Sequence, residues 1–349
     1  MLEEIRQQPA ALERTLVSEL RRIERFRSAI EQRRPRMVVL AARGTSDNAA
    51  LFGRYLLEIT TGIPVSLAAP SIFTLYGADL DLRDTLVVAI SQSGESTDTN
   101  LVLEKARAQG AMTAGITNES GSTLAKLAEF PFLVRAGREK SVAATKTYTG
   151  QLMMMYLLAY GLGAKIRLED LRRIPEWTAA ALELEPAIRI VAERYRFMDH
   201  AVVVGRGLNY SNAMEFGLKM METCYVVAER FSSADFQHGP IAMVERGFPV
   251  FLFAAAGVTW PGQQEMLTKV QALKAETLLI TDESNREAAV AGRAFVVPVK
   301  LAVRGASPAE LFTPIPYIIP AQLFAASLAE VKGLDPDQPR TLSKVTRTL

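Results

Sequence analysis

Two stretches of the sequence decide the fold: MVVLAARGTS at 37–46 and TLVVAISQSGESTDT at 85–99. Each begins as a continuous apolar run and ends in a turn rich in glycine and hydroxyl side chains, after which a helical segment follows. The same order returns at MTAGITN, 112–118, which follows the helical segment TNLVLEKARAQG. Apolar strands that alternate with helices are typical of a parallel sheet covered by helices on both faces. The pattern therefore predicts an α/β fold with a doubly wound parallel sheet.

This pattern occurs twice in the chain. Gly207 in VVVGRGLNYSNAM lies 163 residues after Gly44 in VVLAARGTSDNAA, and Gly257 after PVFLFAAA lies 163 residues after Gly94. The strand in LLITD aligns with the strand in AGITN within one residue of the same offset. A register that is shared over several strands indicates duplication. We therefore predict two tandem doubly wound domains of the flavodoxin-like kind.

Helical segments flank and separate these two domains. Leucine and isoleucine recur at helical spacing between charged residues, which predicts an amphipathic helix over 10–31 that ends before Pro35. Between about 161 and 197 a charge-rich helical stretch replaces the strand pattern. The predicted boundaries are 1–31 for the N-terminal helical segment, 32–165 for the first domain, 166–197 for the helical linker, 198–335 for the second domain and 336–349 for a C-terminal tail.

The composition limits the classes of function. The 349 residues carry 40 basic and 38 acidic side chains, a net charge of +2, so no basic surface for nucleic acid is implied. The apolar stretches are far shorter than the roughly 20 residues needed to cross a bilayer, and the start MLEEIRQQPAALERTL is unlike a signal peptide. Cys224 is the one cysteine, which excludes an internal disulfide and a cysteine-rich metal site. We expect a cytoplasmic protein that binds neither membrane nor nucleic acid.

The segment Ser91–Thr97, SQSGEST, is the candidate anion site. It lies where a buried strand is followed by a helix, so free backbone N–H groups and the positive end of the helix dipole attract phosphate, and its hydroxyls add donors. A serine-rich turn with a helix-capping residue is the alternative, and spacing alone leaves both open. A nucleotide is disfavoured, because ARGTSD lacks the glycine pattern of a dinucleotide-binding turn and no P-loop occurs.

Glu215, Lys219 and Glu222 form a candidate acid–base group, since their spacing places them on one face of a helix. A carboxylate beside an ammonium suits aldose–ketose isomerisation, in which a proton moves between adjacent carbons through an enediol or enolamine. A surface ladder of ion pairs is the alternative. His238, in the turn FQHGP, is a candidate proton-transfer group because an imidazole titrates near neutrality, with a structural role in the turn as its alternative. His200, just before a strand, is interpreted as structural.

These segments resemble the sugar isomerase (SIS) domain family. SQSGESTDT looks like the family's signature, and RGTSDNA is similar to its second contact loop. Further matches are EKSVAATKTYTGQL at 139–152, SNAMEFGLKMMETCYVVAERFSSADFQHGP at 211–240 and the tail DPDQPRTLSKVTRTL. Together these five motifs resemble the isomerase half of glucosamine-6-phosphate synthase over essentially the whole chain.

The resemblance implies roles for individual residues. Glu222 matches the isomerising base and Lys219 a lysine that shapes the same site, while His238 matches the histidine that opens the sugar ring and reaches the neighbouring subunit's site. Lys344 matches a lysine in a tail that closes over the sugar and can form an imine with its open-chain carbonyl. The matching phosphate contacts are Ser91, Gln92, Ser93 and Ser96, and the matching sugar contacts are Ser46, Val142, Ala143 and Ser343. Thr145 and Lys146 also match, with no assigned role beyond bracing their loop.

Three departures from the synthase pattern bear on the reaction. The synthase carries a glutaminase domain whose nucleophile is the first cysteine, whereas this sequence starts at the isomerase half. Arg43 stands where the synthases often have a cysteine before GTS. The segment SVAATK replaces the more usual GVASTK. We therefore expect the reverse reaction, in which glucosamine 6-phosphate is converted through an enolamine to fructose 6-phosphate and ammonia. The ending KVTRTL resembles the stand-alone SIS-type glucosamine-6-phosphate deaminases.

Two alternatives remain open. One is a different enzyme with the same chemistry, either a fructosamine-6-phosphate deglycase or an ammonia-using relative of glutamine-fructose-6-phosphate aminotransferase. The other is a non-catalytic sugar-phosphate sensor, against which the joint presence of Glu222, His238 and Lys344 argues. No cofactor or metal is expected, because side chains suffice for the proton transfers and no cluster has metal-ligand spacing. The match of His238 implies a homodimer with a shared active site.

Overall fold

The computed structural model describes residues 1–303, 305 and 308–342. Contacts divide these residues into two compact units, each of which is described by itself. The first unit comprises Ala10–Glu139 and Lys146–Arg172, and the second comprises Met1–Pro9, Lys140–Thr145 and Arg173–Leu342.

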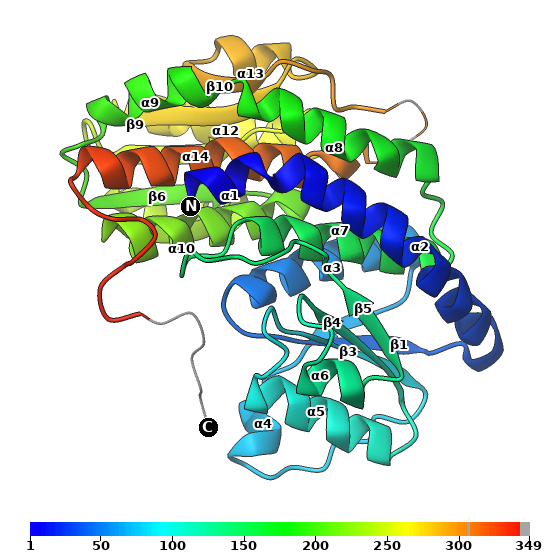
Figure 1. Cartoon of the computed structure of the whole chain (residues 1–349). Helices are drawn as coiled ribbons and strands as arrows, with labels where there is room; N and C mark the ends of the chain where they lie inside the picture. Colours follow the sequence, from blue (N-terminus) through cyan, green and yellow to red (C-terminus); the bar gives the residue numbers. More distant parts are fainter. Residues whose placement is uncertain (304, 306–307, 343–349) are drawn as a thin grey trace. The chain divides into compact units, whose positions relative to one another are not determined.

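The first unit is built on a five-stranded parallel sheet with the strand order β2-β1-β3-β4-β5 (Figure 1). Its central strands are buried along their length because they are continuous apolar runs with helices on both faces. The strands are β1 (Met37–Ala41), β2 (Val65–Leu67), β3 (Thr85–Ile90), β4 (Met112–Thr117) and β5 (Phe130–Leu133).

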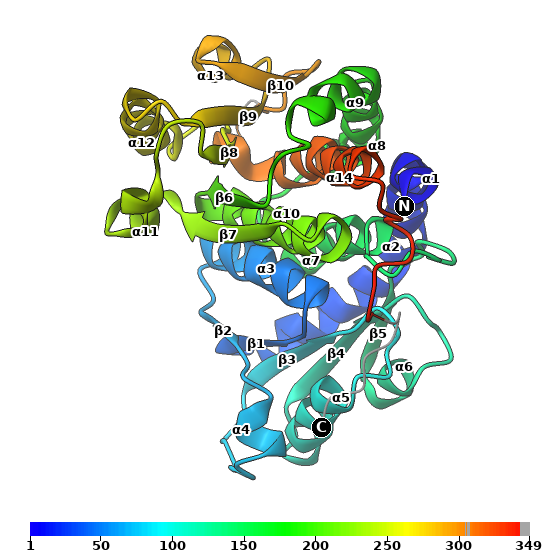
Figure 2. The same ribbon diagram turned by 90° about the vertical axis from the view of Figure 1, so that its left-hand side faces the viewer.

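Helices cover both faces of this first sheet. They are α2 (Gln8–Arg33), α3 (Thr45–Thr61), α4 (Ser71–Thr74), α5 (Thr97–Ala108), α6 (Thr123–Leu127) and α7 (Lys146–Gly161). In Figure 2, α3 and α7 lie on one face and α5 and α6 on the other. The amphipathic helix predicted over 10–31 is α2, whose buried Phe26 packs edge-on against Phe130 and Phe132 at ring distances of 5.3 and 5.6 Å. That prediction is confirmed.

The second unit repeats the architecture with the strand order β10-β9-β8-β6-β7. Counted from the first strand of each sheet, both sheets have the doubly wound order 2-1-3-4-5. The strands are β6 (His200–Gly205), β7 (Val227–Ser232), β8 (Pro249–Phe253), β9 (Glu276–Asp282) and β10 (Arg293–Val297). The prediction of two tandem, flavodoxin-like parallel sheets is therefore confirmed.

The helices of the second unit include an apolar helix, α14, with most of its side chains buried. In Figure 2, α10 and α14 lie on one face of the sheet and α11, α12 and α13 on the other. Edge-on contacts of Phe216 with Phe251 and Phe324, at 5.3 and 6.0 Å, join α10, β8 and α14. The elements are α1 (Leu2–Arg6), α9 (Glu185–Arg194), η1 (Gly207–Asn209), α10 (Tyr210–Cys224), α11 (Ser233–Gln237), η2 (Pro240–Met243), α12 (Trp260–Ala272), α13 (Arg286–Val290), η3 (Ala309–Phe312) and α14 (Pro314–Val331).

The predicted helical stretch between the two sheets is also observed, as α8 (Leu168–Leu182) and α9. The division between the units falls within α8. In the part of the chain that the structure describes, no helix combines the length and apolar character that a membrane span requires.

Candidate functional site

The first sheet reverses its strand order between β1 and β3, and loops that follow such neighbouring strands form a crevice where doubly wound proteins bind ligands. The two loops here are 42–44 after β1 and 91–96 after β3. Each contains a glycine in the left-handed region, Gly44 at φ 58° and Gly94 at φ 67°. The predicted anion loop therefore lies at the switch point of the first sheet.

Gly94 is the residue that fixes the shape of this loop. A Cβ there would lie 2.2 Å from Oγ of Ser122, and the positive φ by itself disfavours any other residue. The Gly94 carbonyl accepts hydrogen bonds from the backbone N–H of Leu124 at 3.0 Å and from Nδ2 of Asn100 at 3.2 Å. The turn is thus held tightly against α5 and α6.

The four predicted phosphate contacts differ in their surroundings. Ser91 is buried, and its Oγ accepts a hydrogen bond from the Gly94 N–H at 3.1 Å, so this hydroxyl stabilises the turn itself. Gln92, Ser93 and Ser96 are partly exposed. Ser96 is the residue at the N-cap of α5, but its side chain makes no capping hydrogen bond. Ser96 therefore does not act as the side-chain cap that the alternative interpretation requires. The Ser96 hydroxyl lies at the N-terminus of a 12-residue helix.

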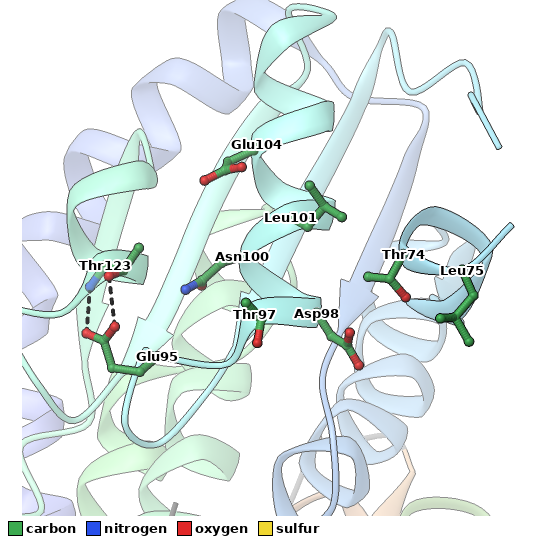
Figure 3. A pocket seen from close by; sticks show the side chains of 9 residues that line it. All are labelled: Thr74, Leu75, Glu95, Thr97, Asp98, Asn100, Leu101, Glu104 and Thr123. Carbon is green, nitrogen blue, oxygen red and sulfur yellow. Dashed lines mark hydrogen bonds between the residues drawn. The ribbon is translucent and has the colours of Figure 1, made fainter. Parts of the chain in front are cut away.

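A groove of about 410 Å³ runs along the exposed side of α5 (Figure 3). Three carboxylates, those of Glu95, Asp98 and Glu104, line it, and the lining contains no basic side chain. The Glu95 carboxylate accepts hydrogen bonds from N and Oγ1 of Thr123, at 2.9 and 2.8 Å. The remaining lining residues are Thr74, Leu75, Thr97, Asn100, Leu101 and Thr123. None of the four predicted phosphate contacts is among them, and the charge of this groove does not favour an anion.

Ser46, a predicted sugar contact, lies in the first turn of α3 and is buried. Its Oγ accepts a hydrogen bond from Nε2 of Gln151 at 2.9 Å, which joins α3 to α7. Lys146, at the start of α7, is also buried and donates through Nζ to the carbonyl of Arg138 at 2.7 Å. This contact fits the bracing role that the sequence suggested for Lys146.

In the second unit, Glu215, Lys219 and Glu222 lie on one face of α10, as their spacing predicted. Nζ of Lys219 is 3.4 Å from Oε1 of Glu215 and donates a hydrogen bond to Oε2 of Glu222. The side chains of Lys219 and Glu215 are fully buried, whereas that of Glu222 is 23% exposed. A solvated surface ladder is therefore the wrong interpretation of these residues.

The charge of Lys219 follows from its neighbours. Burial by itself lowers the pKa of a lysine, but the carboxylates of Glu215 and Glu222 outweigh it, so the pKa of Lys219 is raised. Lys219 is accordingly an ammonium at neutral pH. Of the three side chains, Glu222 is the one with access to a ligand.

Close packing and a sharp ending position α10. A Cβ at Gly217 would lie 2.4 Å from Cγ of Arg230, so glycine lets α10 approach β7. The helix ends at Cys224 because Tyr225 adopts the left-handed conformation at φ 55°. The Cys224 thiol is buried, its pKa is raised to about 11 by burial, and it donates to the Ala325 carbonyl at 3.1 Å. A thiol of that kind is a packing residue.

His238 follows α11, and its side chain is exposed to solvent. Its backbone N–H donates to the carbonyl of Asp235 at 3.1 Å, which closes the turn. His200 is exposed at the start of β6, with its ring 5.1 Å from that of Phe248. Ser343 and Lys344, the two predicted contacts in the tail, lie outside the described residues.

The loop of residues 140–145, which contains the predicted contacts Val142 and Ala143, is held within the second unit. The carboxylate of Glu4 accepts hydrogen bonds from the backbone N–H groups of Lys140 and Ser141. The Val142 N–H donates to the Asp337 carbonyl at 3.3 Å. Ala143 is buried. The backbone N–H of Val142 is therefore already paired within the chain.

Sequence reasoning missed several residues that support these loops. Glu4 is one, and Gln151, the partner of Ser46, is another. Glu139 is a third, since its carboxylate accepts hydrogen bonds from N and Oγ1 of Thr147 at the start of α7. Only Glu139 had a local signal, an acidic residue shortly before a helix.

Two doubly wound sheets in one chain, with glycine turns at the switch point, define a tandem α/β protein. A family model described as "SIS domain" matches residues 32–160 and 196–329. An isomerizing glutamine–fructose-6-phosphate aminotransferase from Pyrococcus horikoshii is 33% identical over 355 residues, which cover 99% of this chain and 57% of that protein. The chain belongs to the SIS domain family and spans little more than half the length of this relative.

Solved structures agree with this assignment. The C-terminal domain of glucosamine-fructose-6-phosphate aminotransferase from Francisella tularensis is similar with a TM-score of 0.87 and 28% identity, over 97% of this chain and 98% of that one. A glucosamine-6-phosphate deaminase from Thermotoga maritima shares the fold, with a TM-score of 0.71 and 21% identity over 97% of this chain and 100% of that one. The prediction of a SIS-family enzyme is confirmed.

Proposed function

We propose that this chain is a sugar-phosphate isomerase that deaminates amino sugar 6-phosphates, with glucosamine 6-phosphate as its main substrate. The observation that carries the proposal is the group on α10. A fully buried ammonium, Lys219, is bonded to two carboxylates, and only Glu222 of the three is accessible. Such an arrangement suits a carboxylate that moves a proton between two carbons, because the ammonium holds it in place.

The proposed reaction begins with ring opening, in which His238 carries a proton to the ring oxygen and leaves an aldehyde at C1. Glu222 then removes the proton from C2 while the oxygen at C1 gains a proton, which gives the enolamine. Protonation of C1 and loss of a proton from nitrogen give an imine at C2. Water adds to C2, ammonia leaves, and fructose 6-phosphate remains. Water is the only co-reactant.

The phosphate group of the same substrate is assigned to the loop that contains Ser91, Gln92, Ser93 and Ser96. Support comes from the N-terminus of α5, which presents backbone N–H groups to an anion, and from the side chain of Ser96, which makes no capping bond. Ser46, Val142 and Ala143 are proposed sugar contacts. We assign Ser343 to the sugar as well, and Lys344 to transient imine formation with the open-chain carbonyl.

A homodimer with a shared active site follows from the proposed role of His238. Its exposure directly after α11 suits a residue that acts on a substrate in a neighbouring subunit. The cytoplasm is the proposed compartment, because the one cysteine is a buried thiol that requires no oxidising environment.

A synthetic direction is the second candidate. Relatives named as glutamine–fructose-6-phosphate aminotransferases match 99% of this chain, which favours a shared isomerisation chemistry that could use free ammonia. A fructosamine-6-phosphate deglycase would use the same kind of proton transfer in the opposite direction: the nitrogen is on C1, the proton moves from C1 to C2, and hydrolysis of the imine at C1 releases the amine and an aldose 6-phosphate.

The test is to incubate the purified chain with glucosamine 6-phosphate and to measure both ammonia and fructose 6-phosphate. Equal amounts of the two products are expected. Parallel reactions use fructose 6-phosphate with ammonium, and fructosamine 6-phosphates, to separate the three enzymes. Absence of turnover on this whole panel, with sugar-phosphate binding intact, would instead support a sensor and contradict the proposal.

A further inference from the structure

Arg43 occupies the position where the sequence departs from the synthase pattern, and the proposed reaction does not use it. It follows β1 in the switch-point loop, and its side chain is 49% exposed. Its Nε and Nη2 both donate to Oδ2 of Asp98, at 3.1 and 2.7 Å. Asp98 lies in the first turn of α5 and is only 2% exposed.

Asp98 creates an electrostatic problem for an anion at this loop. The sequence of the loop, SQSGEST, contains one acidic residue and no basic one, and Asp98 follows it directly. The other oxygen of the carboxylate, Oδ1, has no hydrogen-bond partner among the described residues, so Arg43 supplies the contacts that stabilise its charge. A phosphate dianion beside an uncompensated buried carboxylate would be repelled strongly, because such charges are poorly screened.

We propose that Arg43 is a positioning residue for phosphate binding and that it acts through Asp98. By neutralising this carboxylate, Arg43 leaves the N-terminus of α5 attractive to a dianion, and the same contact joins the loop after β1 to the first turn of α5. Glu95, the one acidic residue of the loop itself, is turned to the side of α6, where Thr123 donates to it (Figure 3). The inference rests on the proposed role of the loop in phosphate binding.

The test is isothermal titration of the full chain with inorganic phosphate and with fructose 6-phosphate. Arg43→Gln is expected to weaken the affinity for both about tenfold or more, the effect of about 1.4 kcal/mol. Asp98→Asn is expected to strengthen it severalfold, since the buried negative charge is removed while Arg43 keeps its positive charge beside the loop. The double variant, Arg43→Gln with Asp98→Asn, is expected to bind within about threefold of the parent. Arg43→Lys retains the charge but cannot make both hydrogen bonds to Asp98, so it is expected to bind more tightly than Arg43→Gln and less tightly than the parent.

A matched control is Arg54→Gln, which removes an exposed ion pair with Glu58 on α3. It is expected to leave phosphate affinity unchanged. Parent-like binding by Arg43→Gln would overturn the proposal. A double variant as weak as Arg43→Gln would also overturn it, because that result assigns the pair a purely structural role. If Arg43→Gln does not fold, the Asp98→Asn variant provides the test. A phosphate affinity of Asp98→Asn that is no tighter than that of the parent would contradict the inference. A parent that binds neither probe refutes the phosphate loop itself and with it the proposed function.

Discussion

The two sheets have the same strand order but carry different side chains at corresponding places. Gly44 and its counterpart Gly207, 163 residues later, have φ values of 58° and 57°, so the backbone turn after the first strand is preserved. After the third strand, Ser91, Gln92 and Ser93 precede Gly94 in the first sheet, whereas Ala254, Ala255 and Ala256 precede Gly257 in the second. Hydroxyl and amide side chains thus precede this glycine in the first sheet, and methyl side chains precede it in the second.

In the loop after the third strand of the second sheet, a buried side chain also occupies the space next to the glycine. A Cβ at Gly257 would lie 1.7 Å from Oε2 of Glu310, a buried carboxylate of η3. The helices that follow the first strand show the opposite difference. At the offset of 163 residues, Glu215, Lys219 and Glu222 of α10 correspond to Phe52, Leu56 and Ile59 of α3. Duplication therefore kept the backbone, and the two copies diverged into one candidate phosphate loop and one candidate acid–base helix.

The largest effect on activity is expected from a substitution in α10, the candidate acid–base helix of the second copy. Glu222→Gln should lower kcat about 10²–10⁴-fold, because it removes the proposed proton carrier while keeping the size of the side chain. Steady-state kinetics measure the loss, and titration should show unchanged affinity for fructose 6-phosphate. The control is Glu229→Gln, an exposed carboxylate on β7, which should retain parent activity. Turnover by Glu222→Gln at the parent rate would break the assignment of chemistry to α10.

Lys219→Met should cost about 3–5 kcal/mol of unfolding free energy, because it leaves Glu215 buried without its cation. The pKa of Lys219 is raised in the folded chain, so its stabilising contribution is present below the unfolded value of about 10.4 and is lost as pH rises through the folded pKa. Urea unfolding of parent and variant between pH 7 and 11 measures this. A difference in unfolding free energy between parent and variant that increases at high pH would contradict the account.

A pair of glycine substitutions sharpens the comparison of the two loops. Gly94→Ala should reduce phosphate affinity about tenfold or more, since the added Cβ displaces Ser122 and strains the turn. Gly257→Ala should lower stability, because the Cβ collides with Glu310, but should leave phosphate affinity intact. Titration with inorganic phosphate measures the affinity, and thermal unfolding measures the stability. Gly121→Ala, which has open space around its Cβ position, is the control. Equal loss of phosphate affinity in both loop variants would remove the distinction.

The smallest expected effect belongs to a single hydroxyl. Ser93→Ala should weaken phosphate binding by about 1 kcal/mol, roughly fivefold, by deleting one donor. The reciprocal change, Ala256→Ser, should create no second phosphate site, because Glu310 fills the space at Gly257. Titration with inorganic phosphate gives the stoichiometry. Two sites per chain in Ala256→Ser would show that the second loop had kept an open cradle.

The sequence predicted the central strands and not the edges. The strands identified in advance are mostly buried, and the clearest of them, β3 and β8, are buried along their whole length and are predominantly apolar. The four that escaped prediction, β2, β5, β7 and β10, are the edge strands of the two sheets. An edge strand is partly exposed, so its sequence is mixed, as in VAERFS of β7. Periodicity cannot distinguish such a segment from a loop.

The candidate site shows the same limit. The shared face of Glu215, Lys219 and Glu222 follows from helical spacing, and the structure confirms it. The contacts of Glu4 with Lys140 and Ser141 join residues more than 130 positions apart, which no local pattern reveals. Arg43 and Asp98 are likewise separated by 55 positions. Sequence spacing therefore identifies functional side chains that lie together on one helix. The residues that hold the neighbouring loops in place come from distant parts of the chain, and only the tertiary structure identifies them.

The measurement that tests the central claim most directly is proton exchange in D₂O, followed by NMR with glucosamine 6-phosphate as substrate. The account predicts that the parent chain introduces deuterium at C1 of the fructose 6-phosphate formed or at C2 of recovered substrate. Glu222→Gln should bind the same sugar phosphate and show no exchange. Exchange by Glu222→Gln at the parent rate, or a parent chain that binds the substrate but shows neither exchange nor product, would contradict the claim that α10 carries the proton transfer.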